Sequence, residues 1–286
     1  MFVRTLTRQQ LLLCAALLPV LFLSGCGDAE SPVAVTPPEP KTEAPTPTAP
    51  ARRVSDDPQA MTIADLREKL GIGDAGRITK VGGRIVGMDL QNTPVSDLSP
   101  LAGLPLKELY LEDTKVSDIS GLAGMPLEKL YLSRTQVTDL APLMGMQFDE
   151  LNLVGTPLKD ITPLREVEFR TLWIPETQVV DLSPLAGRSF VSLDLRDTPV
   201  SDLSPLAGNE TLRRLHIAGT NVTDVTPLAG MQLERLVLTP SRITQGLDAL
   251  RNMTSLKALD TSFDGVSPVK TPDEFWGMYD AGELNE

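Results

Sequence analysis

Residues 106–124 read LKELYLEDTKVSDISGLAG, and this stretch recurs along the chain with small changes. The units are spaced by 21 residues, apart from one spacing of 22 after Phe190. Their first residues are Leu106, Leu127, Phe148, Phe169, Phe190, Leu212 and Leu233. A degenerate unit begins at Ile85 and a truncated unit at Leu256, which makes about nine units. A period of this length predicts a solenoid, in which each unit packs only against its neighbours.

The first half of each unit predicts a short strand. In Leu109-Tyr110-Leu111 the two leucines point into the core and Tyr110 points outward. Strands of successive units then stack in parallel, about 4.8 Å apart. A threonine follows each strand, and we expect its hydroxyl to bond to the backbone of the turn. These threonines are Thr93, Thr114, Thr135, Thr156, Thr177, Thr198 and Thr220.

The second half of each unit returns the chain to the next strand. In residues 202–208, DLSPLAG, the serine suits a helix N-cap, the proline the first helical position and the glycine the helix end. The segment therefore predicts one α or 3₁₀ turn. As a whole, the unit resembles the short leucine-rich repeats of the internalin type. This resemblance implies an α/β solenoid with a parallel β-sheet on the concave face and single helical turns on the convex face.

Both ends of the repeats carry segments that suit caps, which terminal repeats need because their leucines are otherwise exposed. Residues 62–70 predict an amphipathic helix that ends at Gly71, and Gly82-Gly83 predicts a hairpin leading into the first repeat strand. Thr271 and Glu274 form a capping-box pattern with Pro272 at the first helical position.

The N-terminus has the pattern of a targeting segment. Arg4 and Arg8 precede an apolar run over residues 11–23, which is too short to span a bilayer comfortably. The run ends in LSGC at residues 23–26, which resembles the lipobox of bacterial lipoproteins. The resemblance implies cleavage before Cys26 and acylation of that cysteine. An ordinary signal peptide with a chance cysteine is the alternative.

Residues 27–58 are rich in proline, threonine, alanine and glutamate, a composition that predicts an extended tether. At about 3.1 Å per residue it would reach roughly 100 Å. The lipobox resemblance implies a lipid anchor in the bacterial cell envelope. Because Gly27, and not aspartate, follows Cys26, the same resemblance favours the outer membrane or the cell surface over the inner membrane.

These features divide the chain into five parts. We predict a lipoprotein signal peptide at 1–25, a lipidated cysteine and tether at 26–59, an N-terminal cap helix and hairpin at 60–84, a leucine-rich-repeat domain at 85–265, and a C-terminal cap helix and tail at 266–286.

Composition excludes several kinds of chemistry. The net charge is −12, which disfavours nucleic acid as a partner because phosphates require a basic face. His216 is the single histidine, and Cys14 and Cys26 both precede the repeats. The motifs contain no nucleophile–base pair, phosphate loop or metal cluster. We therefore expect a non-enzymatic protein with no cofactor and no metal.

One outward column of the predicted sheet holds the candidate binding residues. From the first strand to the last it contains Asp89, Tyr110, Tyr131, Asn152, Trp173, Asp194, His216, Val237 and Asp260. Tyrosine and tryptophan are frequent in the energetic centres of protein interfaces, and three of the chain's five occur in this column. We predict partner contacts at Tyr110, Tyr131, Asn152, Trp173, Asp194 and His216. The alternative is that aromatic residues occur here because they favour sheet surfaces.

Charges differ between the two ends of the repeats. Acidic residues surround the early units at Glu108, Glu112, Asp113, Glu128, Asp149 and Glu150, and arginines surround the later ones at Arg170, Arg196, Arg213, Arg214 and Arg235. A surface with two signs can orient a protein partner. The alternative is an ordinary solvated face with no such role.

An aspartate precedes each predicted helical turn, at Asp97, Asp118, Asp139, Asp160, Asp181, Asp202 and Asp224. Stacked carboxylates suggest calcium, but repeats arrange them in a row, whereas calcium needs oxygens around one point. We expect each side chain to accept backbone N–H groups of its own turn. For His216, which has no second histidine nearby in the motif, we expect a surface side chain.

Together these features predict a membrane-anchored, non-catalytic leucine-rich-repeat protein, monomeric in itself, that binds another protein through its concave face. One alternative is a structural protein of the envelope that assembles through its repeats. Another is a sensor or enzyme-associated subunit with activity that the motifs do not reveal.

Overall fold

The computed structural model describes residues 62–263 and 269–284. The predicted signal peptide, the tether and Cys26 lie outside the described residues. Residues 58–286 form one compact unit, with a single hydrophobic core that runs from Leu66 to Leu284. Among the described residues every member of that core lies in this unit, so residues 58–286 have a hydrophobic core of their own.

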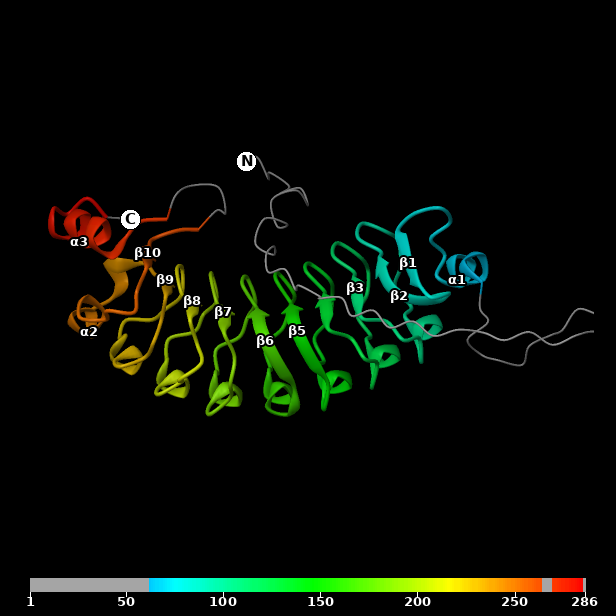
Figure 1. Ribbon diagram of the computed structural model, residues 1–286, viewed down its shortest axis with the longest axis horizontal. Helices are drawn as coiled ribbons and strands as arrows, with labels where there is room; N and C mark the ends of the chain where they lie inside the picture. Colours follow the sequence, from blue (N-terminus) through cyan, green and yellow to red (C-terminus); the bar gives the residue numbers. More distant parts are fainter. Residues whose placement is uncertain (1–61, 264–268, 285–286) are drawn as a thin grey trace, which may run out of the picture. The chain divides into compact units, whose positions relative to one another are not determined.

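The described residues contain one ten-stranded sheet in which the strand order follows the sequence (Figure 1). The strands are β1 (Arg77–Val81), β2 (Arg84–Asp89), β3 (Glu108–Tyr110), β4 (Lys129–Tyr131), β5 (Gln147–Asn152), β6 (Glu168–Trp173), β7 (Ser192–Asp194), β8 (Arg214–His216), β9 (Arg235–Val237) and β10 (Ala258–Asp260). All neighbours from β2 to β10 pair in parallel, and only β1 and β2 pair antiparallel. The predicted leucine-rich-repeat solenoid is confirmed.

The pairing register reproduces the sequence period. Leu109 lies opposite Leu130, and Leu130 opposite Leu151, so identical repeat positions stack across the sheet. The spacing of 22 residues appears where Ser192 pairs with Arg214. Because each strand places its leucine directly beside the leucine of the next strand, the inward side chains form one continuous apolar column.

Each strand is followed by a turn that the threonine closes. The threonine hydroxyl donates a hydrogen bond of 2.6–2.8 Å to the carbonyl three residues earlier, as from Thr156 to Leu153. All seven threonines are buried. The predicted backbone bonding of the threonine column is therefore confirmed, and each bond stays within its own repeat.

The residue before each threonine adopts a left-handed conformation. Its φ lies between 56° and 73° in seven successive repeats, at Asn92, Asp113, Arg134, Gly155, Glu176, Asp197 and Gly219. Side chains rarely adopt this conformation, so five of these turns carry backbone strain. At Gly219 the glycine is required for a second reason, since a Cβ there would lie 2.0 Å from Oδ1 of Asp197.

The return segments form short 3₁₀ turns on the convex side (Figure 1). They are η3 (Ser99–Leu101), η4 (Ser120–Leu122), η5 (Ala141–Leu143), η6 (Thr162–Glu166), η7 (Ser183–Leu185), η8 (Ser204–Leu206) and η9 (Thr226–Leu228). A further 3₁₀ turn, η10 (Pro240–Arg242), directly follows β9, in the turn where earlier repeats carry the threonine. The prediction of single helical turns is confirmed. The assignment of serine as N-cap is wrong in detail, because Ser204 is the first helical residue and Leu203 the cap.

The aspartate column supplies the missing caps. Asp202 accepts a hydrogen bond from the backbone N of Ser204 at 2.8 Å, and all seven aspartates make the equivalent bond at 2.7–2.8 Å. Hydrogen bonds from Ser99 hold the pKa of Asp97 below its usual value. The structural interpretation of this column is thereby confirmed.

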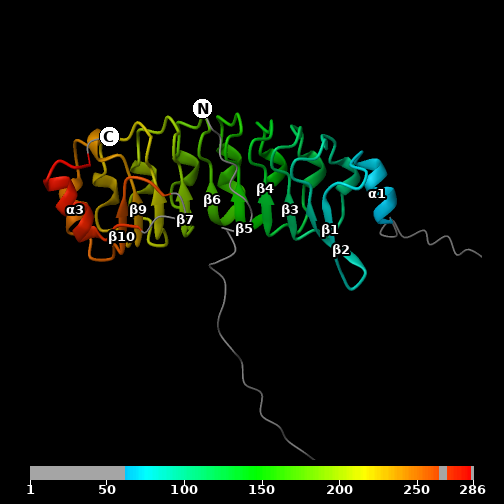
Figure 2. The same cartoon turned by 90° about the horizontal axis from the view of Figure 1, so that it is seen from above.

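The two ends of the sheet differ from the repeats. Helix α1 (Ile63–Lys69) begins at the N-cap Thr62 and buries Leu66. The β1–β2 hairpin follows and extends beyond the row of repeats (Figure 2). Strand β2 belongs both to this hairpin and to the parallel sheet, so cap and repeats share one element.

At the other end, α2 (Leu247–Arg251) replaces the last 3₁₀ turn, and α3 (Pro272–Asp280) follows β10. The capping box expected at Thr271 and Glu274 is present. Phe275 and Trp276 of α3 are buried, with their rings 5.1 Å apart and edge to face. These aromatic rings cover leucines that a terminal repeat would otherwise expose to water.

Removing one core leucine should destabilise the whole unit. Leu172 is fully buried between Leu151 and Leu193 of the adjacent strands. We expect Leu172→Ala in residues 58–286 to lower the free energy of unfolding by about 2–5 kcal/mol, because it leaves a cavity. Urea denaturation measures this. Met144→Ala, at a side chain that is 43% exposed, is the control and should cost little; equal losses in both would contradict the stacked core.

Candidate functional site

The concave face carries rows of side chains that cross the strands. Because alternate residues of a strand point to the same side, the residues two before and two after Tyr110 share its face. Glu108 and Glu112 therefore flank Tyr110 on β3. The same positions on β4 hold Lys129 and Ser133, on either side of Tyr131.

Tyr110, Tyr131 and Trp173 form what we call the aromatic strip. The ring centroids of Tyr110 and Tyr131 are 5.0 Å apart, and those of Tyr131 and Trp173 are 6.0 Å apart. Both pairs are tilted, a geometry that adds favourable aromatic contact. Since β4 and β6 are separated by β5, the last two rings lean toward one another across that strand.

Asn152 of β5 lies in the column between these rings. Its Oδ1 accepts hydrogen bonds from Oγ of Ser133 at 2.8 Å and from the backbone N of Val154 at 3.1 Å. These bonds draw the amide toward the neighbouring row. The amide oxygen of this candidate residue is therefore already bonded within the protein.

Glu150 fixes the middle ring. The hydroxyl of Tyr131 donates a hydrogen bond to Oε2 of Glu150, whose other oxygen lies 3.5 Å from Nζ of Lys129. Burial, followed by the Glu150 carboxylate, raises the pKa of Tyr131 well above its usual value. Tyr131 thus stays neutral and held in place, which lowers the entropy that it would lose on contact with a partner.

Asp194 and His216 form a pair further along the column. Nδ1 of His216 lies 3.5 Å from Oδ1 of Asp194, which also accepts a hydrogen bond from the backbone N of Arg196 at 2.9 Å. The expectation of an exposed His216 is wrong, since the residue is only 9% exposed and its Nε2 has no hydrogen-bond partner.

His216 is one of three neighbouring residues that are buried at the C-terminal end of the column. Val237 and Asp260, the next two residues, are 1% and 4% exposed. Asp260 accepts hydrogen bonds from both the backbone N and Nζ of Lys270, in the segment that returns toward α3. The candidate column is thus most accessible over its first strands.

Half of the six acidic residues predicted around the early repeats have basic partners. Lys107 pairs with Glu128 at 2.8 Å, and Arg134 binds Asp113 through two hydrogen bonds of 2.5 and 2.6 Å. Together with Lys129 and Glu150, these contacts offset half of the six predicted acidic residues. Glu108, within 3.4 Å of the Tyr110 hydroxyl, and Glu112 remain on the concave face.

Glu112 is the most perturbed carboxyl in the described part of the chain. Its Oε2 is buried without a hydrogen-bond partner. Burial raises the pKa of Glu112 to about 7, and the nearby Asp89 adds to the effect. Strand alternation places Glu112 on the face of the strip, but the burial of its carboxyl depends on neighbouring repeats. The sequence alone therefore gave no reason to single out Glu112 among the other acidic residues.

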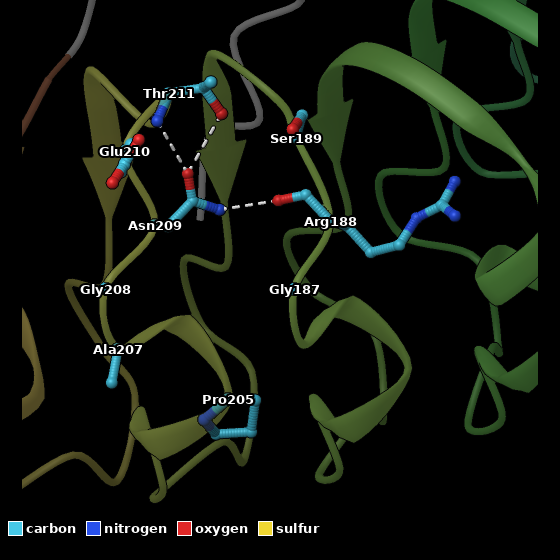
Figure 3. A pocket seen from close by; sticks show the side chains of 9 residues that line it. All are labelled: Gly187, Arg188, Ser189, Pro205, Ala207, Gly208, Asn209, Glu210 and Thr211. Carbon is cyan, nitrogen blue, oxygen red and sulfur yellow. Dashed lines mark hydrogen bonds between the residues drawn. The ribbon is translucent and has the colours of Figure 1, made fainter.

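The hollows in the surface lie outside the aromatic strip. One of about 220 Å³ lies where the extra residue enters the 22-residue repeat (Figure 3). There Asn209 accepts hydrogen bonds from Thr211 and donates one to the carbonyl of Arg188 at 2.9 Å. The Arg188 side chain points away from Asn209 and binds the carbonyls of Arg165 and Val167 (Figure 3). These polar groups are occupied by neighbouring repeats, so the hollow has a structural explanation.

Two further findings concern residues 62–263 and 269–284 alone. No group of three or more histidine, cysteine, aspartate or glutamate residues in them is arranged to hold a metal ion. None of their helices combines the length and apolar character that crossing a membrane requires.

Comparison with known proteins points to one family. No protein-family model and no curated protein matches the chain. Solved structures do match, among them internalin C2 of Listeria monocytogenes, at 33% identity over 54% of this chain and 70% of that one, with a TM-score of 0.48. Internalin InlF of the same species is 21% identical over 70% of both chains, with a TM-score of 0.46. The functional domain of InlJ, also from that species, is 18% identical over 61% of this chain and 48% of that one, with a TM-score of 0.35.

The chain belongs to the leucine-rich-repeat proteins. Its parallel strands, 21-residue register and 3₁₀ returns define that class from its own geometry.

The raised pKa of Glu112 predicts a dependence of stability on pH. The folded state retains this proton up to pH about 7, whereas the unfolded chain releases it near 4.5. Stability therefore falls as pH rises from about 5 to about 8. Glu112→Gln should remove this slope and stabilise residues 58–286 by about 1–2 kcal/mol at pH 8. Urea denaturation at several pH values measures it.

Glu234→Gln is the matched control, because Glu234 is exposed and pairs with Lys257 at 3.0 Å. It should leave the slope unchanged. A Glu112→Gln protein that kept the wild-type slope between pH 5 and 8 would contradict the burial of this carboxyl as its cause.

Proposed function

We propose that this protein is a lipid-anchored component of the bacterial cell envelope whose leucine-rich repeats bind another protein through the concave face. The aromatic strip is the observation that carries the binding part of this proposal. Three rings of the types that dominate interface energetics lie in contact at 5.0 and 6.0 Å, on strands where the described residues leave the column half-buried, whereas its last three members are buried.

Rigidity supports this function. The strip lies on paired strands, Tyr131 is held by Glu150, and Asn152 is held by Ser133. A partner would therefore meet a surface that is already ordered and would lose little conformational entropy there. The two hollows of about 220 and 790 Å³ in the described part of the chain are lined by residues outside the strip, which favours a macromolecular partner at the strip over a small molecule.

The anchor is proposed on sequence alone. The lipobox pattern at residues 23–26 and the proline-rich residues 27–58 support a lipid on Cys26 and a spacer behind the repeats. A spacer of roughly 100 Å would let the concave face reach a partner away from the membrane surface. In this proposal the protein presents its repeats to a partner and has no catalytic role. Its location is the outer membrane or the cell surface.

Loss of the aromatic strip should abolish partner capture. Residues 58–286 serve as bait for envelope extract, and bound proteins are identified by mass spectrometry. Tyr131→Ala combined with Trp173→Ala should weaken the affinity for a captured partner at least about thirtyfold, because the loss of even one central aromatic residue costs about 2 kcal/mol. Titration calorimetry with the purified partner measures this.

Phe263→Ala is the control, since Phe263 is an aromatic residue that is 41% exposed and lies outside the strip. It should bind as the wild type does. Equal recovery of every partner by the wild type and the double variant would refute the proposed function, and self-association of the bait alone would favour an assembly protein instead.

Acylation of Cys26 has a separate test. Cells that produce the full chain are grown with a labelled fatty acid, and the protein is isolated. The wild type should carry the label and Cys26→Ser should lose it, because the acceptor thiol is removed. Undiminished labelling of Cys26→Ser would disprove the anchor without affecting the proposal for the concave face.

A further inference from the structure

Glu112 and the aromatic strip meet at one place on the concave face. Glu112 follows Tyr110 by two residues, at the end of β3, and therefore lies on the same side of the sheet. Tyr131, across the strand pair, lies close enough for its ionisation to be affected by Glu112. One carboxyl thus lies beside two aromatic rings whose centroids are 5.0 Å apart.

The carboxyl is only partly compensated by its own surroundings: the backbone N–H of Glu112 donates a hydrogen bond to it and Arg134 attracts it, but burial outweighs both and raises its pKa. Its Oε2 is buried with no hydrogen bond, while the side chain as a whole is half-buried and keeps an exposed edge. The charged groups that face it are Asp89 on β2, Asp113 in the following turn and Arg134 after β4. Two of these repel a carboxylate, and Arg134 is already bound by both oxygens of Asp113.

A cation is the ligand group best suited to bind beside the Glu112 carboxyl and the two tyrosine rings. A poorly hydrated carboxylate gains most from a charged donor, and such hydrogen bonds are about twice as strong as neutral ones. Aromatic faces attract the same cation through their quadrupole. A planar guanidinium can meet both at once, by bonding to the carboxylate with its edge while its plane stacks on a tyrosine ring.

We propose that the concave face holds a binding site for a cationic side chain, an arginine of the partner protein, between the Glu112 carboxylate and the rings of Tyr110 and Tyr131. This inference rests on the proposed function and specifies its partner: a basic segment that inserts arginine at β3 and β4. Trp173, two strands from Tyr131, then contacts the apolar residues beside that arginine.

Ring-labelled tyrosine offers a direct readout, because the chain contains three tyrosines. Tyr110 and Tyr131 lie at the site, and Tyr279 lies in α3 and serves as an internal control. N-acetyl-arginine amide is titrated into labelled residues 58–286 and followed by NMR. N-acetyl-citrulline amide, which has the same shape without the charge, is the matched probe.

The arginine amide should shift the Tyr110 and Tyr131 signals saturably and leave Tyr279 unchanged, whereas the citrulline amide should shift none. Glu112→Gln should weaken arginine binding about tenfold or more, as expected for a lost hydrogen bond between charged groups. Glu234→Gln, with the same change in net charge, should bind as the wild type does.

The pH dependence gives a second measurement. Because the pKa of Glu112 is about 7, the carboxyl is mostly neutral at pH 6 and mostly ionised at pH 8. Arginine should therefore bind more tightly as pH rises through 7, and this gain should be absent in Glu112→Gln. His216, the single histidine, lies on β8, five strands from β3, and is therefore remote from the site.

Several results would overturn the inference: equal binding of arginine and citrulline amides, unchanged affinity in Glu112→Gln, or no shift at either tyrosine. Tyrosine shifts caused by chitotetraose and not by arginine would assign the face to a saccharide, and a dimer in sedimentation would assign it to a second copy. If the double variant loses a captured partner while Glu112→Gln retains it, the proposed function stands and the arginine site is refuted.

Discussion

The stacking of each repeat on its neighbours is the constraint on which the rest of this structure depends. A single 21-residue turn of chain cannot bury its own leucines, so Leu130 becomes fully buried only because Leu109 and Leu151 lie on either side of it. Parallel pairing at about 4.8 Å requires every repeat to keep the same length and shape. Strained left-handed residues such as Arg134 and Glu176 are held in place by this stack.

The same stacking turns single residues into surfaces. A side chain that occurs once per repeat becomes one member of a row, and its neighbours in space are residues 21 positions away in the sequence. Tyr131 and Glu150 are 19 residues apart, yet they share a hydrogen bond. The aromatic strip and the perturbed Glu112 are products of this arrangement, because the ring contacts and the influence of Asp89 and Arg134 on Glu112 all cross from one repeat to another.

The ends of the solenoid limit which part of the surface can act. At the N-terminal end the hairpin shares β2 with the sheet and leaves the concave face of β3 and β4 accessible. At the C-terminal end Lys270 binds Asp260, and the column from His216 onward is covered. The candidate site is therefore displaced toward the early repeats, although the repeat pattern itself treats all strands alike.

The sequence by itself determined the solenoid, the parallel strands, the single helical returns and the structural use of the threonine and aspartate columns, while the structure decided that the returns are 3₁₀ turns. These features are local: Thr156 bonds to Leu153, Asp202 bonds to Ser204, and the period repeats each bond. Sequence also placed Tyr110, Tyr131 and Trp173 in one column, because strand alternation is a local rule.

Only the tertiary structure decided which of these side chains touch and which are covered. The lean of Trp173 across Asn152 depends on rotamers, the burial of His216 on packing at the far end of the sheet, and the unpaired oxygen of Glu112 on charges contributed by three repeats. The burial of a side chain and the charge around it depend on all of its neighbours in space. A sequence pattern therefore identifies which residues form a row on the sheet, but the exposure and pKa of each residue depend on the fold.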